Sequence, residues 1–139
     1  MKRALVICPG RGTYTRESLG HLEATASVLA ADHYRASLGR PGPTELDRAE
    51  AYQSSKHVAG ENASILTLAC SLADWDLLER VQVVGVIGNS MGWYTALTVA
   101  GALPLADGLR LVETMGQYQK DNVIGGQLVY PLVDADWQP

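Results

Sequence analysis

Apolar and polar residues follow one another along this 139-residue chain in a way that predicts strands and helices in turn. Two short apolar runs rich in β-branched residues, Ala4–Cys8 and Val81–Ile87, predict buried strands. Between them, Glu17–Ser37 carries apolar residues at helical spacing, and Asn62–Leu78 is apolar almost all round, as in a helix covered on most sides. Continuous apolar strands separated by helices predict an α/β fold with a parallel sheet and covering helices on both of its faces.

Turn and cap signals add further elements. Thr44–Asp47 has the form of a capping box and predicts the start of a short, more polar helix. Trp93–Ala100 predicts a helix that Gly101 stops, and a further helix is expected from Leu105 onward. Leu128–Val133 predicts a last strand.

Composition and charge narrow the classes of function. Apolar residues make up 47% of the chain, which indicates a globular domain, and a net charge of −4 argues against nucleic acid as a partner. No apolar run approaches the length of a membrane span, so no membrane partner is expected. Cys8 and Cys70 match no metal spacing and predict two reduced thiols in a cytoplasmic protein, and the three histidines do not cluster with acidic residues. No metal site and no bound cofactor are therefore expected.

Ser90 lies in the sequence Gly88-Asn89-Ser90-Met91-Gly92, between the second predicted strand and the Trp93–Ala100 helix. This is the G-x-S-x-G pattern in a strand–turn–helix context, which lifts a nucleophilic serine to the top of a sheet. The turn leaves no room for side chains two residues before or after the serine, and the helix directs free N–H groups at the same point. The pattern predicts a nucleophile at Ser90, although an ordinary strand–helix turn with small residues would read similarly.

The loop Pro9-Gly10-Arg11-Gly12-Thr13 follows the first strand. It lacks the Lys-Ser/Thr pair of a P-loop and is not G-x-G-x-x-G, so phosphate binding is disfavoured. Loops at the carboxyl ends of parallel strands lie near each other. The backbone N–H groups of Arg11 and Met91 are therefore expected to converge as an oxyanion hole.

Four motifs in order resemble one family. These are the Pro9–Gly12 loop, the elbow around Ser90, the Ala100–Leu103 segment and the Asp107–Val112 run. Together they are similar to malonyl-CoA:acyl carrier protein transacylase and to the acyltransferase domains of polyketide synthases, and the similarity covers essentially the whole chain.

The resemblance implies a hydrolase-like α/β large subdomain and a smaller ferredoxin-like subdomain. Residues 1–126 would form the N-terminal part of the first, and residues 127–139 the truncated start of the second, with Leu128–Val133 as its first strand. It also implies acyl transfer, in fatty acid or polyketide biosynthesis, from a coenzyme A thioester to the phosphopantetheine thiol of an acyl carrier protein. Ser90 would carry the acyl group, and the amides of Arg11 and Met91 would hold the oxyanion.

Departures from the family pattern concern the substrate site. Arg11 replaces the loop glutamine, Asn89 replaces the histidine before the serine, and Trp93 replaces a glutamate. Met115 stands where the family has the arginine that holds the free carboxylate of malonate, and a methionine cannot form that bidentate pair. Asn89, Trp93 and Met115 are therefore expected to line a site for an uncharged acyl group, although Met115 would equally suit the core.

The resemblance also leaves the chain without a general base. A serine nucleophile needs a neighbouring base, and none of His21, His33 and His57 matches the position of the family's catalytic histidine. The chain is therefore expected to correspond to the N-terminal half of the domain. The missing C-terminal half, as part of the same protein or as a separate chain, is an expected partner.

Two other functions suit the same residues. A serine thioesterase or esterase would use water as the acceptor. A non-catalytic remnant would bind only an acyl carrier protein, for which Lys2, Arg3, Arg11 and Arg16 supply positive charge near the first loop. Ordinary solvated charge is the better explanation of these four residues, because such runs usually mean only that.

Overall fold

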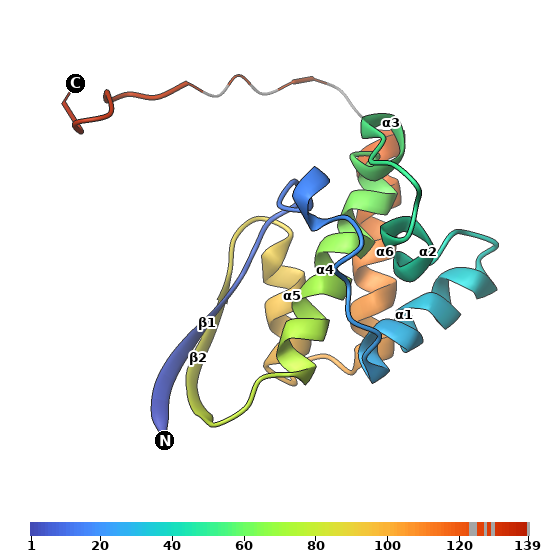
Figure 1. Cartoon of the computed structure of the whole chain (residues 1–139), viewed down its shortest axis with the longest axis horizontal. Coiled ribbons are helices and arrows are strands. Elements are labelled where there is room, and N and C mark those ends of the chain that lie inside the picture. Colours follow the sequence, from blue (N-terminus) through green and yellow to red (C-terminus); the bar gives the residue numbers. More distant parts are fainter. Residues whose placement is uncertain (123–124, 127, 129, 139) are drawn as a thin grey trace.

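A parallel sheet and a layer of helices make up the fold, as the computed structural model in Figure 1 shows. It describes residues 1–122, 125–126, 128 and 130–138. The elements in this part of the chain are β1 (Lys2–Cys8), a 3-10 turn (Arg16–Ser18), α1 (Ala26–Ser37), α2 (Pro43–Asp47), α3 (Ser54–His57), α4 (Gly60–Asp76), β2 (Val81–Gly88), α5 (Gly92–Val99) and α6 (Leu105–Asp121). The predicted α/β class with a parallel sheet is confirmed.

The first predicted helix is shorter than its apolar spacing suggested. It begins at Ala26, where the side chain of Thr25 accepts a hydrogen bond from the N–H of Val28. The preceding segment is held instead by Asp47, whose carbonyl and carboxylate accept the N–H groups of Gly20 and Leu22. Since these backbone groups bond to α2, they do not form helical turns.

Helix α4 lies at the centre of the helical layer and contacts α1, α2, α3, α5 and α6. Its buried Ile65, Leu66 and Leu68 have no exposed surface, and burying each contributes roughly 1.5–3 kcal/mol. The hydroxyls of Ser64 and Thr67 are satisfied inside the helix by the carbonyls four residues earlier, so their burial costs little. The all-round apolar pattern of the sequence therefore identified a central helix.

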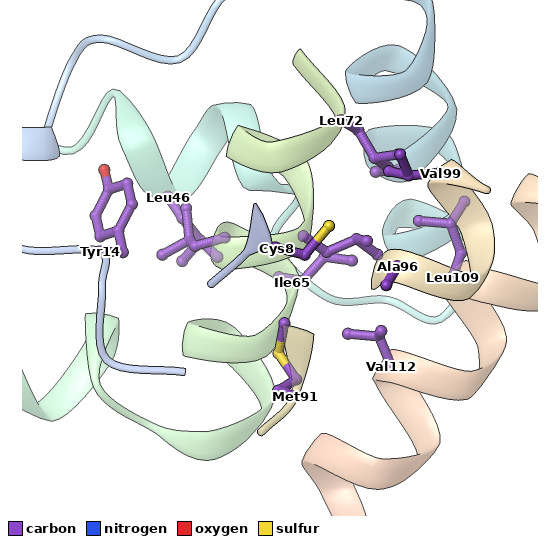
Figure 2. Close-up of a cluster of buried hydrophobic side chains, with 13 residues drawn as sticks. Cys8, Tyr14, Leu46, Ile65, Leu72, Met91, Ala96, Val99, Leu109 and Val112 are labelled. Atoms are coloured by element: carbon purple, nitrogen blue, oxygen red, sulfur yellow. The ribbon is translucent and has the colours of Figure 1, made fainter. Parts of the chain in front are cut away.

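The core joins this helical layer to the sheet through Cys8, the last residue of β1. Figure 2 shows Cys8 in the same cluster as Ile65 of α4 and Ala96 of α5. Because strand side chains alternate, Val6 also faces the helices while Leu5 and Ile7 face away.

The opposite face of the sheet carries no covering helix in the described part of the chain. Leu5 and Ile7 are 55% and 64% exposed, and Val84 and Ile87 on β2 are also exposed. Val84 is the extra residue of a bulge, because Ala4 pairs with Val83 and Leu5 with Gly85. The sequence led us to expect helices on both faces, and the described residues supply them on one.

The predicted strand Leu128–Val133 is not formed by its described residues. Leu128 and residues 130–133 are in no strand, and Val129 lies outside the described residues. Apolar sequence alone does not make a strand, since its backbone groups need a partner strand. The described sheet pairs β1 only with β2.

A buried ion pair holds α1 against α6. The side chain of Arg35 is fully buried, and its Nη1 donates to both carboxylate oxygens of Glu113 at 2.8 and 2.9 Å. Arg40 also pairs with Glu113, while Nη2 of Arg35 donates to Asn62 Oδ1 at 2.6 Å and Nε to the carbonyl of Pro41 at 2.9 Å. Every donor group of the Arg35 fork is thus engaged.

We expect Glu113→Ala to lower the free energy of unfolding by about 3–5 kcal/mol, because it leaves the buried Arg35 charge uncompensated. Urea unfolding of the protein followed by circular dichroism measures this. Glu50→Ala, at an exposed glutamate, is the control and should change stability by no more than about 0.5 kcal/mol. Equal effects of the two substitutions would contradict the structural role of the pair.

The open sheet face predicts self-association of residues 1–139 when they are expressed alone, since exposed apolar patches and unpaired strand edges promote contact between copies. Ile7→Lys should shift the chain toward monomer in sedimentation velocity, because it places a charge at the centre of this face. Leu29→Lys, at an apolar residue exposed on α1, should not. A chain that is monomeric before any substitution would overturn this prediction.

Candidate active site

Ser90 stands at the turn between β2 and α5 with an exposed side chain and a φ of 53°. This left-handed conformation is uncommon for a residue other than glycine and costs of order 1–3 kcal/mol. The turn is closed by the N–H of Gly92, which donates to the carbonyl of Asn89 at 2.7 Å. Strand, left-handed serine and helix thus follow one another as the motif predicted, and the role of Ser90 as a nucleophile stays a prediction.

The two glycines of the motif have a steric reason that the structure makes explicit. A Cβ at Gly88 would collide with the backbone of Gly92 and Trp93. A Cβ at Gly92 would collide with the carbonyl of Cys8 and lie 2.7 Å from the carbonyl oxygen of Pro9. Helix α5 therefore starts in direct backbone contact with the end of β1, and only glycine permits this.

The loop after β1 lies against the elbow. A Cβ at Gly10 would be 3.1 Å from the Asn89 carbonyl oxygen and 3.2 Å from Ser90 Cβ. The N–H of Asn89 donates to the carbonyl of Cys8 at 3.0 Å and joins the two loops. The structure thus brings together the two segments that the sequence predicted would meet, 80 residues apart.

The amides of Arg11 and Met91 flank this contact. In the described part of the chain, neither N–H donates to a protein acceptor. The side chain of Met91 is buried in the core, which fixes the backbone of the elbow. The Arg11 side chain, by contrast, is exposed. Unpaired N–H groups beside a nucleophile are what an oxyanion hole requires.

None of the three histidines forms a hydrogen bond with the Ser90 hydroxyl among the described residues. His57 is buried, and both of its ring nitrogens are engaged: Nδ1 with the backbone of Gln53 and Nε2 with the carbonyl of Leu46 at 2.9 Å. It also stacks on Tyr52 and Tyr14. His57 is therefore part of the packing between α2 and α3, and His21 and His33 are exposed.

A cleft of about 520 Å³ begins at Arg11, the residue after Gly10. Tyr14, Tyr52, His57, Gly60 and Lys120 also line it. Burial alone would raise the pKa of Glu61, but the hydrogen bond from Lys120 Nζ at 2.6 Å and nearby positive charges lower it. Glu61 therefore pairs with Lys120 as a carboxylate.

A second cavity, of about 230 Å³, lies between β1 and α4. Cys8 and Cys70 line it, and burial raises the pKa of both thiols, that of Cys70 to about 11. Protonated thiols are poor nucleophiles, so Ser90 is the better candidate despite the two cysteines. Ser90 lines neither this cavity nor the cleft at Arg11.

The remaining candidate residues occupy different surroundings. Asn89 is exposed beside Gly10, and Trp93 is 55% exposed in the first turn of α5. Met115 is half-buried on α6, next to Gly116, which packs on Gly60 and Glu61 of α4. Gly60 and Lys120 could not be predicted as part of this region, because no sequence motif links the start of α4 to the end of α6.

Two absences complete the description of the site. In the residues that the structure describes, no three His, Cys, Asp or Glu side chains are grouped as metal ligands. Over the same residues, the helices are too short or too polar to cross a bilayer.

The chain is similar in sequence and in fold to known proteins. No family model matches the sequence. The chain is 33% identical over 103 residues to the non-reducing polyketide synthase adaA of Aspergillus niger. This match covers 73% of the chain and 6% of the synthase. It is 46% identical over 55 residues to the non-reducing polyketide synthase aptA of Emericella nidulans. That match covers 39% of the chain and 3% of the synthase.

A solved structure shares the fold as well. The acyl-carrier-protein S-malonyltransferase of Burkholderia pseudomallei superposes with a TM-score of 0.59 at 28% identity. The match covers 84% of this chain and 38% of that one, so the chain spans well under half of the enzyme. Fold and elbow define an α/β protein of the acyltransferase type. The chain belongs to the acyltransferase family of malonyl-CoA:acyl carrier protein transacylases and polyketide synthase domains and matches part of it.

We expect Gly92→Ala to abolish any reaction at Ser90, because its methyl group would push α5 away from Cys8 and Pro9 and separate the elbow from the first loop. Reactivity is measured by mass spectrometry after treatment with a fluorophosphonate, a general serine reagent. Gly101→Ala is the matched control. It imposes left-handed strain of about 1–2 kcal/mol at the end of α5, but its Cβ meets no atom within 4 Å. Full labelling of Gly92→Ala would show that this close approach does not position Ser90.

Proposed function

We propose that Ser90 accepts an acyl group from a coenzyme A thioester and passes it to the phosphopantetheine thiol of an acyl carrier protein. The observation that carries this is the strained, exposed Ser90 beside the unpaired amides of Arg11 and Met91. Membership of a family that includes an acyl-carrier-protein S-malonyltransferase supports the choice of acceptor.

Each half of the reaction would use the same groups. The Ser90 oxygen would attack the thioester carbonyl as its proton passes to a base, and the C–S bond would break to release the coenzyme A thiol. The carrier thiol would then attack the serine ester and regenerate the hydroxyl. In both steps the negative oxygen of the tetrahedral intermediate would lie between the N–H groups of Arg11 and Met91, an interaction worth about 3–4 kcal/mol per donor.

The base belongs to a part of the protein outside these 139 residues in this proposal. His57 has no free ring nitrogen, and the chain spans 38% of the structurally similar malonyltransferase. The C-terminal half of the domain, in the same polypeptide or as a separate chain, is therefore a proposed partner, together with acyl-CoA and the acyl carrier protein. Met115 supplies no cation and, taken alone, favours an uncharged acyl group.

The proposal predicts that the complete protein, with its C-terminal half present, gains the mass of one acyl group on the Ser90 peptide after incubation with acetyl-CoA or malonyl-CoA. Ser90→Ala should lower this by about 10³-fold or more. Ser71→Ala is the control, because that hydroxyl is bonded within α4 to the Thr67 carbonyl. Acylation that persists in Ser90→Ala would disprove the role of Ser90.

The acceptor is tested in the same reaction. Addition of a holo acyl carrier protein should move the acyl group onto the carrier thiol faster than it appears as free acid. Release of free acid at an unchanged rate would instead identify a thioesterase. Absence of any acyl-enzyme would indicate a non-catalytic protein that only binds an acyl carrier protein.

A further inference from the structure

Arg11 carries a cation with no acidic partner among the described residues. No ion pair or hydrogen bond of its guanidinium with a described residue is found, although the chain has more acidic than basic residues. The nearby Lys120 is already committed to Glu61 at 2.6 Å, and the buried Arg35 to Glu113. An arginine left unpaired in an acidic protein, at the mouth of a cleft, is available to a ligand.

The structure fixes where this cation lies. Arg11 Nη1 is 3.1 Å from the point where a Cβ at Gly60 would stand, and the carbonyl oxygen of Gly116 is 3.2 Å from the same point. The guanidinium thus reaches from the first loop across to the meeting point of α4 and α6. It lies beside Gly116, whose neighbour Met115 supplies no charge. The absence of a side chain at Gly60 leaves the space that the guanidinium occupies.

The same residue is tied to Ser90 through its backbone. A Cβ at Gly10, the residue directly before Arg11, would lie 3.2 Å from Ser90 Cβ. The cleft that Arg11 lines therefore begins one residue from the contact with the nucleophile. Tyr14 and His57, which also line the cleft, already form hydrogen bonds with described residues, and Lys120 is paired with Glu61. Arg11 is thus the cation of this cleft that has no described partner.

We propose that the Arg11 side chain binds an anionic oxygen group of the acyl thioester in this cleft and so selects the substrate. This rests on the proposed function of Ser90. A guanidinium binds carboxylate and phosphate through paired N–H donors, and the thioester offers both: a carboxylate on a dicarboxylic acyl group, or the phosphates of coenzyme A. Arg11 would then have two separate roles, its N–H toward the oxyanion and its guanidinium toward the anion.

The test compares the wild-type protein with Arg11→Met and Arg11→Lys. Arg16→Met removes a positive charge from an exposed residue close in sequence that does not line the cleft, and serves as the matched control. Rates of Ser90 acylation are measured with malonyl-CoA, acetyl-CoA and the malonyl and acetyl thioesters of N-acetylcysteamine, which carry no phosphate. Ratios between substrates are compared, because substitutions at position 11 can also disturb the oxyanion amide.

If the anion is the acyl carboxylate, Arg11→Met lowers the malonyl-to-acetyl ratio of kcat/KM about 10- to 100-fold, both for the coenzyme A esters and for the N-acetylcysteamine esters. Arg11→Lys lowers this ratio less. If it is a coenzyme A phosphate, Arg11→Met lowers both coenzyme A esters about 10-fold or more relative to the N-acetylcysteamine esters. Arg16→Met changes neither ratio in either case. Unchanged ratios in Arg11→Met overturn the inference, as does a wild type that favours the acetyl esters with no preference for coenzyme A.

A binding measurement separates this inference from the proposed function. In Ser90→Ala protein, calorimetry should show that Arg11→Met weakens binding of malonyl-CoA about 10-fold or more, whether or not Ser90 reacts. No acylation of Ser90 in the wild type with any of the four thioesters, but an Arg11-dependent dissociation constant, would disprove the catalytic proposal alone. Equal dissociation constants with and without the Arg11 guanidinium would disprove the present inference alone.

Discussion

The close approach of Gly92 to the backbone of Cys8 and Pro9 is the constraint on which the candidate site depends. It sets the start of α5 against the end of β1, so the two loops at this edge of the sheet share one surface. The hydrogen bond from Asn89 N–H to the Cys8 carbonyl fixes their register, and the left-handed turn at Ser90 then directs the hydroxyl outward. A larger residue at position 92 would separate the start of α5 from the end of β1, even if the rest of the fold were unchanged.

Rigidity elsewhere lets the chain hold that strained turn. Met91, directly after the serine, is buried in the cluster that includes Cys8, Ile65 and Val112, so it anchors the elbow to α4 and α6 (Figure 2). The Arg35–Glu113 pair fastens α1 to the same α6. The packing of this core can offset the strain of one left-handed serine, which is of order 1–3 kcal/mol.

Chemically, the described residues provide an incomplete set of catalytic groups. They supply the candidate nucleophile Ser90, the unpaired amides of Arg11 and Met91 and the Arg11 guanidinium, but the histidines are exposed or engaged in packing. The open face of the sheet shows the same incompleteness in structural terms, since Leu5 and Ile7 are apolar and uncovered. Both features agree with a chain that spans 38% of the malonyltransferase it resembles.

Most of the elements, and the turn that carries the candidate nucleophile, could be predicted from the sequence. Local rules are enough for these: β-branched runs gave β1 and β2, the all-round apolar stretch gave α4, and glycines two residues either side of Ser90 gave the elbow. The start of α1 could not be predicted this way, because Asp47, far along the chain, binds the backbone of Gly20 and Leu22. Leu128–Val133 failed as a strand in its described residues because pairing is not a local property.

Most of the surroundings of Ser90 depend on the packing of distant segments. The sequence predicted the meeting of the two loops from the parallel sheet, but it contained no signal that Arg11 would reach Gly60 and Gly116, which come from two other helices. It likewise could not show that His57 is engaged by Gln53 and Leu46, or that Lys120 is engaged by Glu61. Which charges remain unpaired depends on contacts between distant segments, and packing sets those contacts.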